Sequence, residues 1–269
     1  MYQITIALST AFVLFALYII YRFVFKKHKI NKEILNKPFP DEWKKILKQR
    51  VLYYKNLPED KKKIFENRVK IFLAEKKING ADTIVTDTDR LLVASSAVIP
   101  LFAFPHYHYP NVREVILYPN SFDERFQTND VVGQRNILGM IGDGFMSGVV
   151  ILSKPDLEAA FNGTRHRSNV GIHEFVHLID KADGSVDGVP EILFNHSYSL
   201  PWIREIKKEM KKIKTGHSDI SPYALTNNAE FLAVASEYFF DNPEKMKNRH
   251  TELYNILSEI YKQHPDDYV

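Results

Sequence analysis

The sequence feature that most constrains the fold is the stretch GIHEFVHLID at residues 171–180. Residues four apart lie on one face of an α-helix, so His173 and His177 can reach a single metal ion. Two neutral imidazoles suit zinc. Glu174 follows the first histidine and lies where it can accept a proton from a water whose pKa the zinc lowers to about 7. The pattern therefore predicts a zinc site with Glu174 as its general base.

The alternative interpretation of this stretch is an ordinary amphipathic core helix. Its apolar residues would bury well without any metal: Ile172, Phe175, Val176, Leu178 and Ile179. Burying His173, Glu174 and His177 among them would leave polar groups in need of partners, and unpaired buried polar groups are costly. A metal supplies such a partner, so the zinc interpretation is favoured.

Composition limits which atoms can bind a metal. The chain has 269 residues, 45% of them hydrophobic, which is enough to bury a sizeable core, and it has no cysteine. Disulfides, a thiolate zinc site and a cysteine nucleophile are thus excluded, and any metal must use histidines and carboxylates. His106 and His108, in FPHYHYPNV, lie two apart in a predicted loop without a third ligand nearby, so they are not expected to bind metal.

The N-terminal region predicts a membrane anchor. Residues 4–25 carry no charge before Arg22 and form an apolar run about long enough to span a bilayer as a helix. No positive segment precedes the run, which argues against a cleaved signal peptide; a buried core helix is the other alternative. Lysines follow at once in residues 26–32, so the positive-inside rule predicts a single-pass protein of the cell membrane with its catalytic domain in the cytoplasm. The expected division is an anchor with a basic segment at 1–37 and a catalytic domain at 38–269.

Charge is distributed unevenly along the chain. Lys and Arg dominate residues 26–77, whereas Asp and Glu dominate residues 78–269. A basic segment next to a membrane helix is favoured beside anionic head groups, although much of this charge can simply be solvated. The basic residues lack interleaved aromatic residues on one face, so no nucleic-acid partner is expected.

Hydrophobic periodicity predicts a mixture of helices and strands, and hence an α+β domain. The expected helices span residues 41–54, 57–78, 89–99 and 201–214, with a short helix or turn at 154–161. The expected strands span residues 83–86, 113–119 and 147–153. Residues 181–190 are rich in Gly and Asp and are predicted to be a loop that ends the zinc helix.

A catalytic zinc needs a third protein ligand, which should come from a second helix. The stretch NNAEFLAVASEYFF at residues 227–240 offers Glu230 and Glu237. These carboxylates are seven residues apart, or two turns along one helix face, so either could point inward. Spacing alone cannot choose between them.

Long blocks of sequence resemble the Mlc titration factor A family of zinc metallopeptidases, whose catalytic region is similar to that of anthrax lethal factor. The resemblance covers about residues 38–265. Its blocks occur in the same order as in the family: FPDEW, LPEDKKKIFENRVKIFLAEKKING, YPNVREVILYPNSF, HEFVHLIDKADGSVDGVP, YALTNNAEFLAVASEYFFDNP and LYNILSEIYKQHP.

The resemblance implies a zincin-type metallopeptidase domain of the HExxH-plus-Glu class with one Zn²⁺ per chain. It implies that His173, His177 and Glu230 bind the zinc and that Glu174 is the base and proton shuttle. Tyr223, seven residues before Glu230, matches the family's tyrosine that would donate a hydrogen bond to the tetrahedral oxyanion. Glu237 and Asp180 then become candidates for holding an imidazole N–H. The implied activity is hydrolysis of a peptide or protein substrate, in an aminopeptidase-like manner.

A second function remains open. The family's soluble member binds a transcriptional repressor of glucose uptake. The alternative for this chain is therefore a membrane-tethered regulatory binding module that sequesters a partner protein such as a repressor. The presence of Glu174 and Tyr223 favours the peptidase, because a purely structural zinc site needs neither a base nor an open coordination position.

Overall fold

The computed structural model describes residues 12–15, 18, 33–121, 139–142, 147–162, 168–193 and 199–268. The chain separates into two compact units, Met1–Phe39 and Pro40–Val269. Within the first unit, residues 12–15, 18 and 33–36 are helical. Among the described residues, the second unit contains a sheet, ten α-helices and three short 3-10 helices. It carries every residue discussed below as a candidate site.

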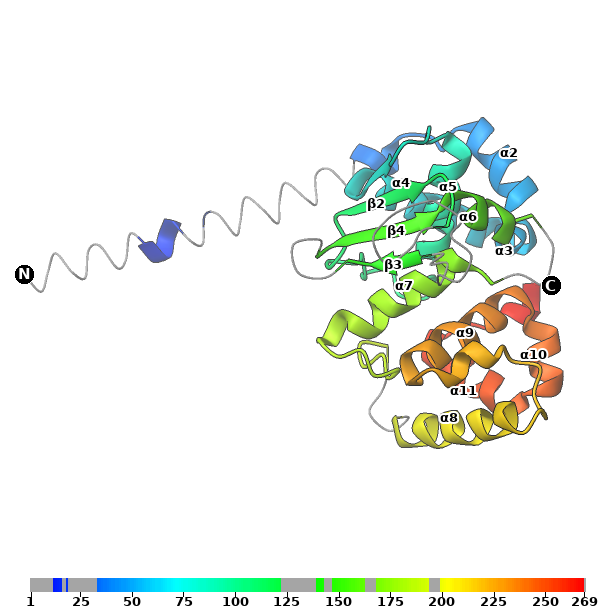
Figure 1. Cartoon of the computed structure of the whole chain (residues 1–269). Coiled ribbons are helices and arrows are strands. Elements are labelled where there is room, and N and C mark those ends of the chain that lie inside the picture. The colour runs from blue at the N-terminus through cyan, green and yellow to red at the C-terminus, as the bar shows by residue number, and fades with distance from the viewer. Residues whose placement is uncertain are drawn as a thin grey trace, which may run out of the picture. The chain divides into compact units, whose positions relative to one another are not determined.

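The sheet has four strands in the order β1-β2-β4-β3 (Figure 1). Strands β1, β2 and β4 run parallel, and β3 pairs antiparallel with β4 at the edge. Every residue of β4 is buried, which is typical of a strand in a parallel sheet that is covered on both faces. The strands are β1 Lys77–Gly80, β2 Glu114–Tyr118, β3 Gly139–Ile141 and β4 Val149–Ser153.

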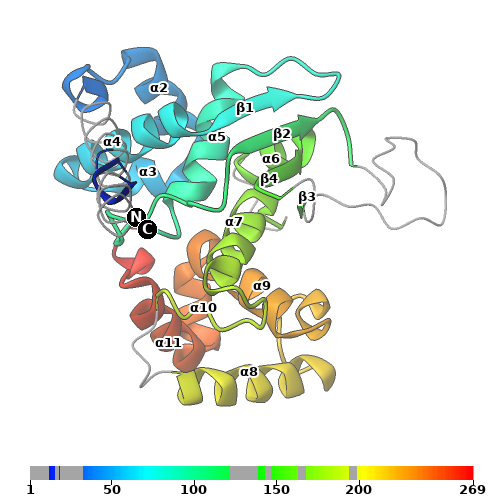
Figure 2. The same ribbon diagram turned by 90° about the vertical axis from the view of Figure 1, so that its left-hand side faces the viewer.

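The helices of the second unit form two groups with α7 between them (Figures 1 and 2). One group surrounds the sheet and contains α2 Asp41–Arg50, α3 Leu52–Asn56, α4 Glu59–Glu75, α5 Asp87–Val98 and α6 Lys154–Ala160. The other group contains α8 Ser199–Lys214, α9 Asn228–Asp241, α10 Pro243–Arg249 and α11 Thr251–Tyr261. Helix α7, Val170–Asp180, contains the HExxH stretch.

Local sequence explains where the central helices begin and how closely they pack. Thr86 and Asp89 form a reciprocal capping box at the start of α5. Helix α7 then packs against α5 through Gly171: a Cβ atom at this position would lie only 2.7 Å from the Cβ of Ser96. Glycine is therefore required where these two helix backbones approach each other. This contact positions the HExxH stretch against α5.

Two sequence-based element predictions are corrected. The strand predicted at residues 83–86 is wrong; the strand is Lys77–Gly80, and Thr86 instead caps α5. The backbone of residues 77–81 pairs with β2, because Lys77 N–H donates to Arg113 O and Ala81 N–H donates to Leu117 O. The single helix predicted over residues 41–54 is interrupted at Val51, whose backbone is extended, so that α2 and α3 are separate helices.

The predicted membrane anchor and single-pass cell-membrane location are also corrected. Among the described residues, the chain forms no helix with the length and apolar character needed to span a bilayer. Most of the predicted span at residues 4–25 lies outside the described residues. The prediction that the catalytic domain is tethered to the membrane depended on this anchor and is therefore not supported.

Candidate metal centre

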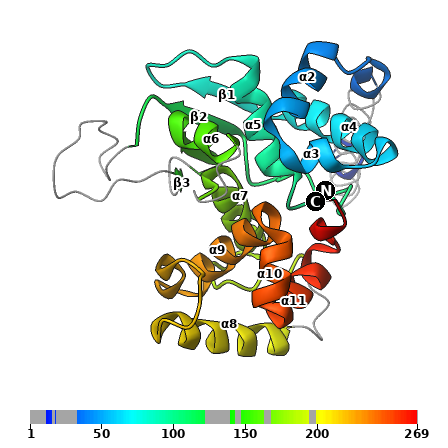
Figure 3. The same cartoon turned by 90° about the vertical axis from the view of Figure 1, so that its right-hand side faces the viewer.

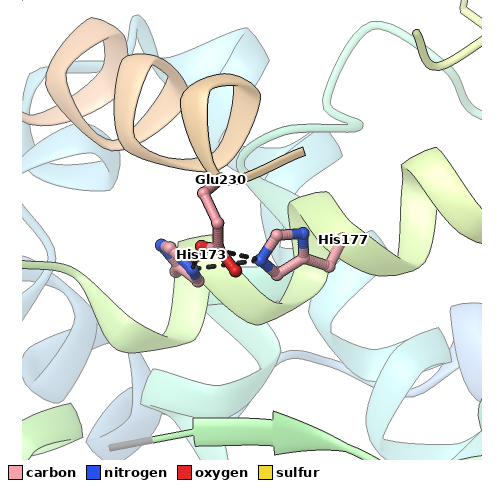
Figure 4. A group of neighbouring side chains, drawn as sticks. All are labelled: His173, His177 and Glu230. Atoms are coloured by element: carbon pink, nitrogen blue, oxygen red, sulfur yellow. Dashed lines mark hydrogen bonds and ion pairs between the residues drawn. The ribbon is translucent and has the colours of Figure 1, made fainter. Parts of the chain in front are cut away.

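The candidate metal centre lies where α7 packs against the first turn of α9. Asn169 caps α7, since its side-chain Oδ1 accepts a hydrogen bond from Ile172 N–H at 3.1 Å. Asn227 caps α9 in the same way by accepting a hydrogen bond from the N–H of Glu230 at 2.9 Å. These caps fix the first turns of both helices; Glu230 lies in the first turn of α9, and His173 and His177 follow along α7. Figure 4 shows the Glu230 carboxylate facing the two imidazoles.

The three side chains bring one atom each to a common point. Glu230 Oε2 lies 3.0 Å from His173 Nε2 and 3.4 Å from His177 Nε2, and the two nitrogens are 3.1 Å apart. Ligands around a tetrahedral zinc, with bonds of about 2.1 Å, are separated by about 3.4 Å. Two imidazole nitrogens and a carboxylate oxygen are also ligands that zinc prefers. The spacing and the chemistry of this group therefore both fit a zinc ion.

Glu237 fixes the orientation of His173. Its Oε1 lies 2.6 Å from His173 Nδ1, and its Oε2 accepts hydrogen bonds from Ser168 Oγ and from Asn169 N–H, both at 2.6 Å. Donation from Nδ1–H to Glu237 leaves the lone pair of Nε2 for the metal, which is the usual arrangement of a carboxylate behind a metal-binding histidine. The sequence did not single out Ser168 or Asn169, although an Asn just before an apolar helix is a recognisable cap signal.

Charge in the site follows from these contacts. Burial opposes ionisation of Glu230, but its hydrogen bonds with His173 and His177 lower the pKa of its carboxyl well below the usual range. Burial lowers the pKa of His173, yet the Glu230 and Glu237 carboxylates outweigh it and raise that pKa well above the ordinary histidine value. The Glu230 carboxylate is thus ionised at the point where a cation would bind.

Glu174 is buried next to His173 in α7 and lies against strand β3. Burial raises the pKa of its carboxyl, while the neighbouring charges of His173 and His177 oppose that rise. A raised pKa suits a group that must accept a proton near neutral pH. A Cβ atom at Gly139 would lie 2.6 Å from Glu174 Cγ and 2.7 Å from its Oε1. The backbone of β3 therefore forms one wall around this carboxylate, a feature that the sequence did not reveal.

Tyr223 lies in a short 3-10 helix, Pro222–Leu225, that precedes α9. Its ring centroid is 6.0 Å from that of His173, and the residue is 43% exposed. The predicted oxyanion donor thus lies next to His173, with part of its surface accessible.

Asp180 does not hold an imidazole among the described residues. Its Oδ2 accepts a hydrogen bond from Gly188 N–H at 2.9 Å, so it ties down the loop that follows α7. Burial raises the pKa of Asp180 to about 6. His108 Nδ1 lies 3.5 Å from Glu75 Oε2, and neither His106 nor His108 joins the metal-binding group in the described part of the chain.

Comparison with known proteins identifies the family. Residues 25–262 match the family described as glucose-regulated metallo-peptidase M90. The chain belongs to this M90 family. The predicted resemblance to the Mlc titration factor A family is confirmed, and the matched region is an M90 metallopeptidase domain of mixed α/β content.

Several relatives of this M90 chain are similar along most of their length. An uncharacterized protein of Synechocystis is 27% identical over 244 residues, which cover 87% of this chain and 88% of that protein. Mlc titration factor A of Pectobacterium atrosepticum is 26% identical over 205 residues, covering 72% and 76% of the two chains. Mlc titration factor A of Klebsiella pneumoniae is 25% identical over 247 residues, covering 88% and 91%.

Proposed function

We propose that this chain is a zinc-dependent peptidase of the zincin type, with His173, His177 and Glu230 as metal ligands and residues 38–269 as its catalytic domain. The observation that carries the proposal is the convergence of the three ligand atoms, which all lie within 4.8 Å of one another. Glu174 is adjacent to this group in α7. Membership of a metallopeptidase family supports the same chemistry.

The residues around the site suggest how hydrolysis would proceed. A bound zinc ion would act as a Lewis acid and lower the pKa of a coordinated water to about 7. Glu174 accepts the proton of the attacking water and later donates it to the leaving amine. The hydroxyl of Tyr223 donates a hydrogen bond to the oxyanion that forms on the substrate carbonyl. Glu237 holds the ring of His173 throughout.

The proposed substrate is a peptide or protein, and the proposed mode is aminopeptidase-like. Acidic residues outnumber basic ones in residues 78–269, which is compatible with the cationic N-terminus of a peptide. Cleavage of a mixed peptide library by the purified full chain would identify the mode. Release of single N-terminal residues is expected, and internal cleavage alone would exclude an aminopeptidase.

The first test of the peptidase proposal is Glu174→Gln. The substitution leaves the three metal ligands in place but removes the proton acceptor, so zinc content is expected to stay at one per chain while kcat falls by about 10²- to 10⁴-fold. Bound zinc and peptide turnover are measured on the same sample. Turnover within a few-fold of the unsubstituted protein would remove Glu174 from the mechanism.

A regulatory function is the second candidate, because relatives over most of the chain bear the name Mlc titration factor A. The name indicates that those proteins titrate Mlc, so this chain is proposed to bind a regulatory protein if it is not primarily a peptidase. The Glu174→Gln variant separates the two functions. If the chain is a binding module, the Glu174→Gln variant should still bind the partner. In that case the unsubstituted chain should hydrolyse no peptide of the library.

A further inference from the structure

A second candidate site lies in a cavity between the two helix groups. The cavity has a volume of about 660 Å³, which falls within the range of about 300–1,000 Å³ typical of small-molecule sites. It is bounded by α3 and the ends of α2 and α6 on one side, and by the α9–α10 junction and the C-terminal residues on the other (Figure 3). Phe161, Phe240 and Pro243 provide buried apolar surface in its lining.

The lining of this cavity carries more positive than negative charge. Its cations are Lys48, Arg50, Lys55 and Lys245, whereas its carboxylates are Asp241 and Glu244. Lys245 already pairs with Asp219, at 2.9 Å. Lys48 and Lys55 are exposed at the rim, where they can attract an anion without the cost of being desolvated.

Arg50 contributes a charged guanidinium to the lining of the cavity. Its Nη2 donates to Glu158 O at 3.0 Å, which anchors the guanidinium to the end of α6. A carboxylate or phosphate oxygen is the natural acceptor for a charged guanidinium that lines a cavity, because the planar group presents several N–H donors.

Asp241 does not oppose an anionic ligand at neutral pH. Burial, together with the nearby charge of Glu237, raises the pKa of its carboxyl to about 8. The carboxyl is therefore mostly protonated at pH 7. In this form it adds no negative charge to the cavity and can donate a hydrogen bond.

We propose that this cavity binds a small organic anion, whose carboxylate or phosphate oxygen accepts a hydrogen bond from Arg50 and whose apolar body packs against Phe161 and Phe240. The site is distinct from the metal centre: Asp241 and Glu230 are eleven residues apart on α9, or about 16 Å along the helix. The proposal does not depend on peptidase activity, because it rests on a different cavity and different residues.

A hydrogen-bonded path connects the proposed anion site with the metal centre. Asp241 Oδ1 accepts a hydrogen bond from Asn169 Nδ2 at 3.2 Å. Asn169 in turn caps α7 and donates its backbone N–H to Glu237, which holds His173. Asp241, which lines the cavity, is thus one hydrogen bond from Asn169, the residue that caps α7.

The test is isothermal titration of the full, zinc-loaded chain with 1-naphthyl phosphate at pH 7. Inorganic phosphate and 1-naphthol serve as probes of the anionic and the apolar part alone. We expect 1-naphthyl phosphate to bind at least about tenfold more tightly than either control, because only it combines a charge-assisted hydrogen bond with buried apolar surface. Absence of binding, or equal binding of 1-naphthol, would overturn the proposal.

Variants then locate the bound probe. Arg50→Lys keeps the charge but removes the planar guanidinium and is expected to weaken binding about tenfold, as is Lys55→Glu at the exposed rim. Lys63→Glu, an equally exposed lysine outside the cavity lining, is expected to leave affinity unchanged. His177→Ala is expected to bind normally. Unchanged affinity in both cavity variants, or lost affinity in His177→Ala, would place the anion elsewhere and contradict the proposal.

Discussion

At the scale of single residues, the two carboxylates of α9 show what sequence spacing can and cannot predict. Glu230 and Glu237 occupy one helix face, so periodicity correctly makes both candidates to face α7. They are about 10 Å apart along the helix axis. Their roles differ because His173 lies between them, with Nε2 facing Glu230 and Nδ1 facing Glu237. The position of His173 between the two carboxylates depends on tertiary packing. At the level of sequence, therefore, only the family resemblance could distinguish the role of Glu230 from that of Glu237.

This difference predicts unequal effects of two substitutions on zinc binding. Glu230→Ala removes one of the three proposed ligands and is expected to abolish stoichiometric zinc binding. Glu237→Ala removes only the hydrogen bond that orients His173, so zinc affinity should fall by about 10- to 100-fold. Zinc titration of both variants measures this, with circular dichroism to verify folding. An empty Glu237→Ala protein beside a fully loaded Glu230→Ala protein would refute the ligand assignment.

At the scale of elements, the contact between β3 and α7 controls the position of the proposed base. Strand β3 is only three residues long and pairs with β4, and the register Gly139↔Leu152 brings Gly139 over α7. Val170 contributes to the same contact, since a Cβ at Gly139 would lie 2.8 Å from its Cγ2. The edge strand and the helix therefore leave no room for a side chain beside Glu174.

Gly139→Ala is therefore expected to lower catalytic activity without loss of zinc. The added methyl group must displace the Glu174 carboxylate, and a displacement of about 1 Å in a catalytic group can cost about 10²-fold in rate. The measurements are kcat, KM and zinc content. Gly216→Ala is the matched control: a Cβ there meets nothing within 4 Å but takes a positive φ of 73°, so it tests backbone strain without touching the site. Equal losses of kcat in both variants would argue against a local effect.

Other elements show why sequence reasoning succeeded in some places and failed in others. Helices α7, α8 and α9 were expected because apolar residues recur at helical spacing over eleven or more residues. The strand Lys77–Gly80 was missed because its burial pattern has one buried residue among four, which gives almost no alternation. Thr83–Thr86 contains β-branched residues typical of strands, yet Thr86 was needed as a helix cap.

At the scale of the whole molecule, a charged cluster centred on His250 holds the helical group together. His250 Nδ1 lies 2.9 Å from Glu209 Oε2 of α8, and its Nε2 lies 2.8 Å from Asp219 Oδ1 in the connection that leads to Tyr223. Asp219 also contacts Tyr238 of α9 and two cations of α10. The cluster was not predicted, because Asp219 and Glu209 lie 31 and 41 residues before His250 in the sequence and follow no periodic pattern.

The His250 cluster predicts a specific pH dependence of stability. Burial lowers the pKa of His250, but Glu209 and Asp219 outweigh it and raise that pKa above the unfolded value of about 6.5. The stabilisation by protonated His250 is therefore complete below about pH 6.5 and is lost as pH rises through the raised pKa. The carboxyl pKa values of Glu209 and Asp219 are lowered, so their contribution is present above about pH 4.5 and is lost as pH falls further.

Replacing His250 with Asn should accordingly destabilise the protein most between about pH 4.5 and 6.5. The expected loss is about 3 kcal/mol in the free energy of unfolding, because the buried carboxylate of Glu209 loses one of its partners. Denaturant unfolding at several pH values measures the difference between the variant and the unsubstituted chain. His217→Asn is the control, since the side chain of His217 is exposed and lies against the hydroxyl of Thr215, away from the carboxylates of the cluster. The difference caused by His250→Asn should shrink as the pH approaches 9, because the histidine of the unsubstituted chain then loses its proton and with it the attraction to both carboxylates. A difference that stays constant from pH 5 to 9 would show that His250 is neutral and that hydrogen bonds alone, without charge, hold α8 to the connection before α9.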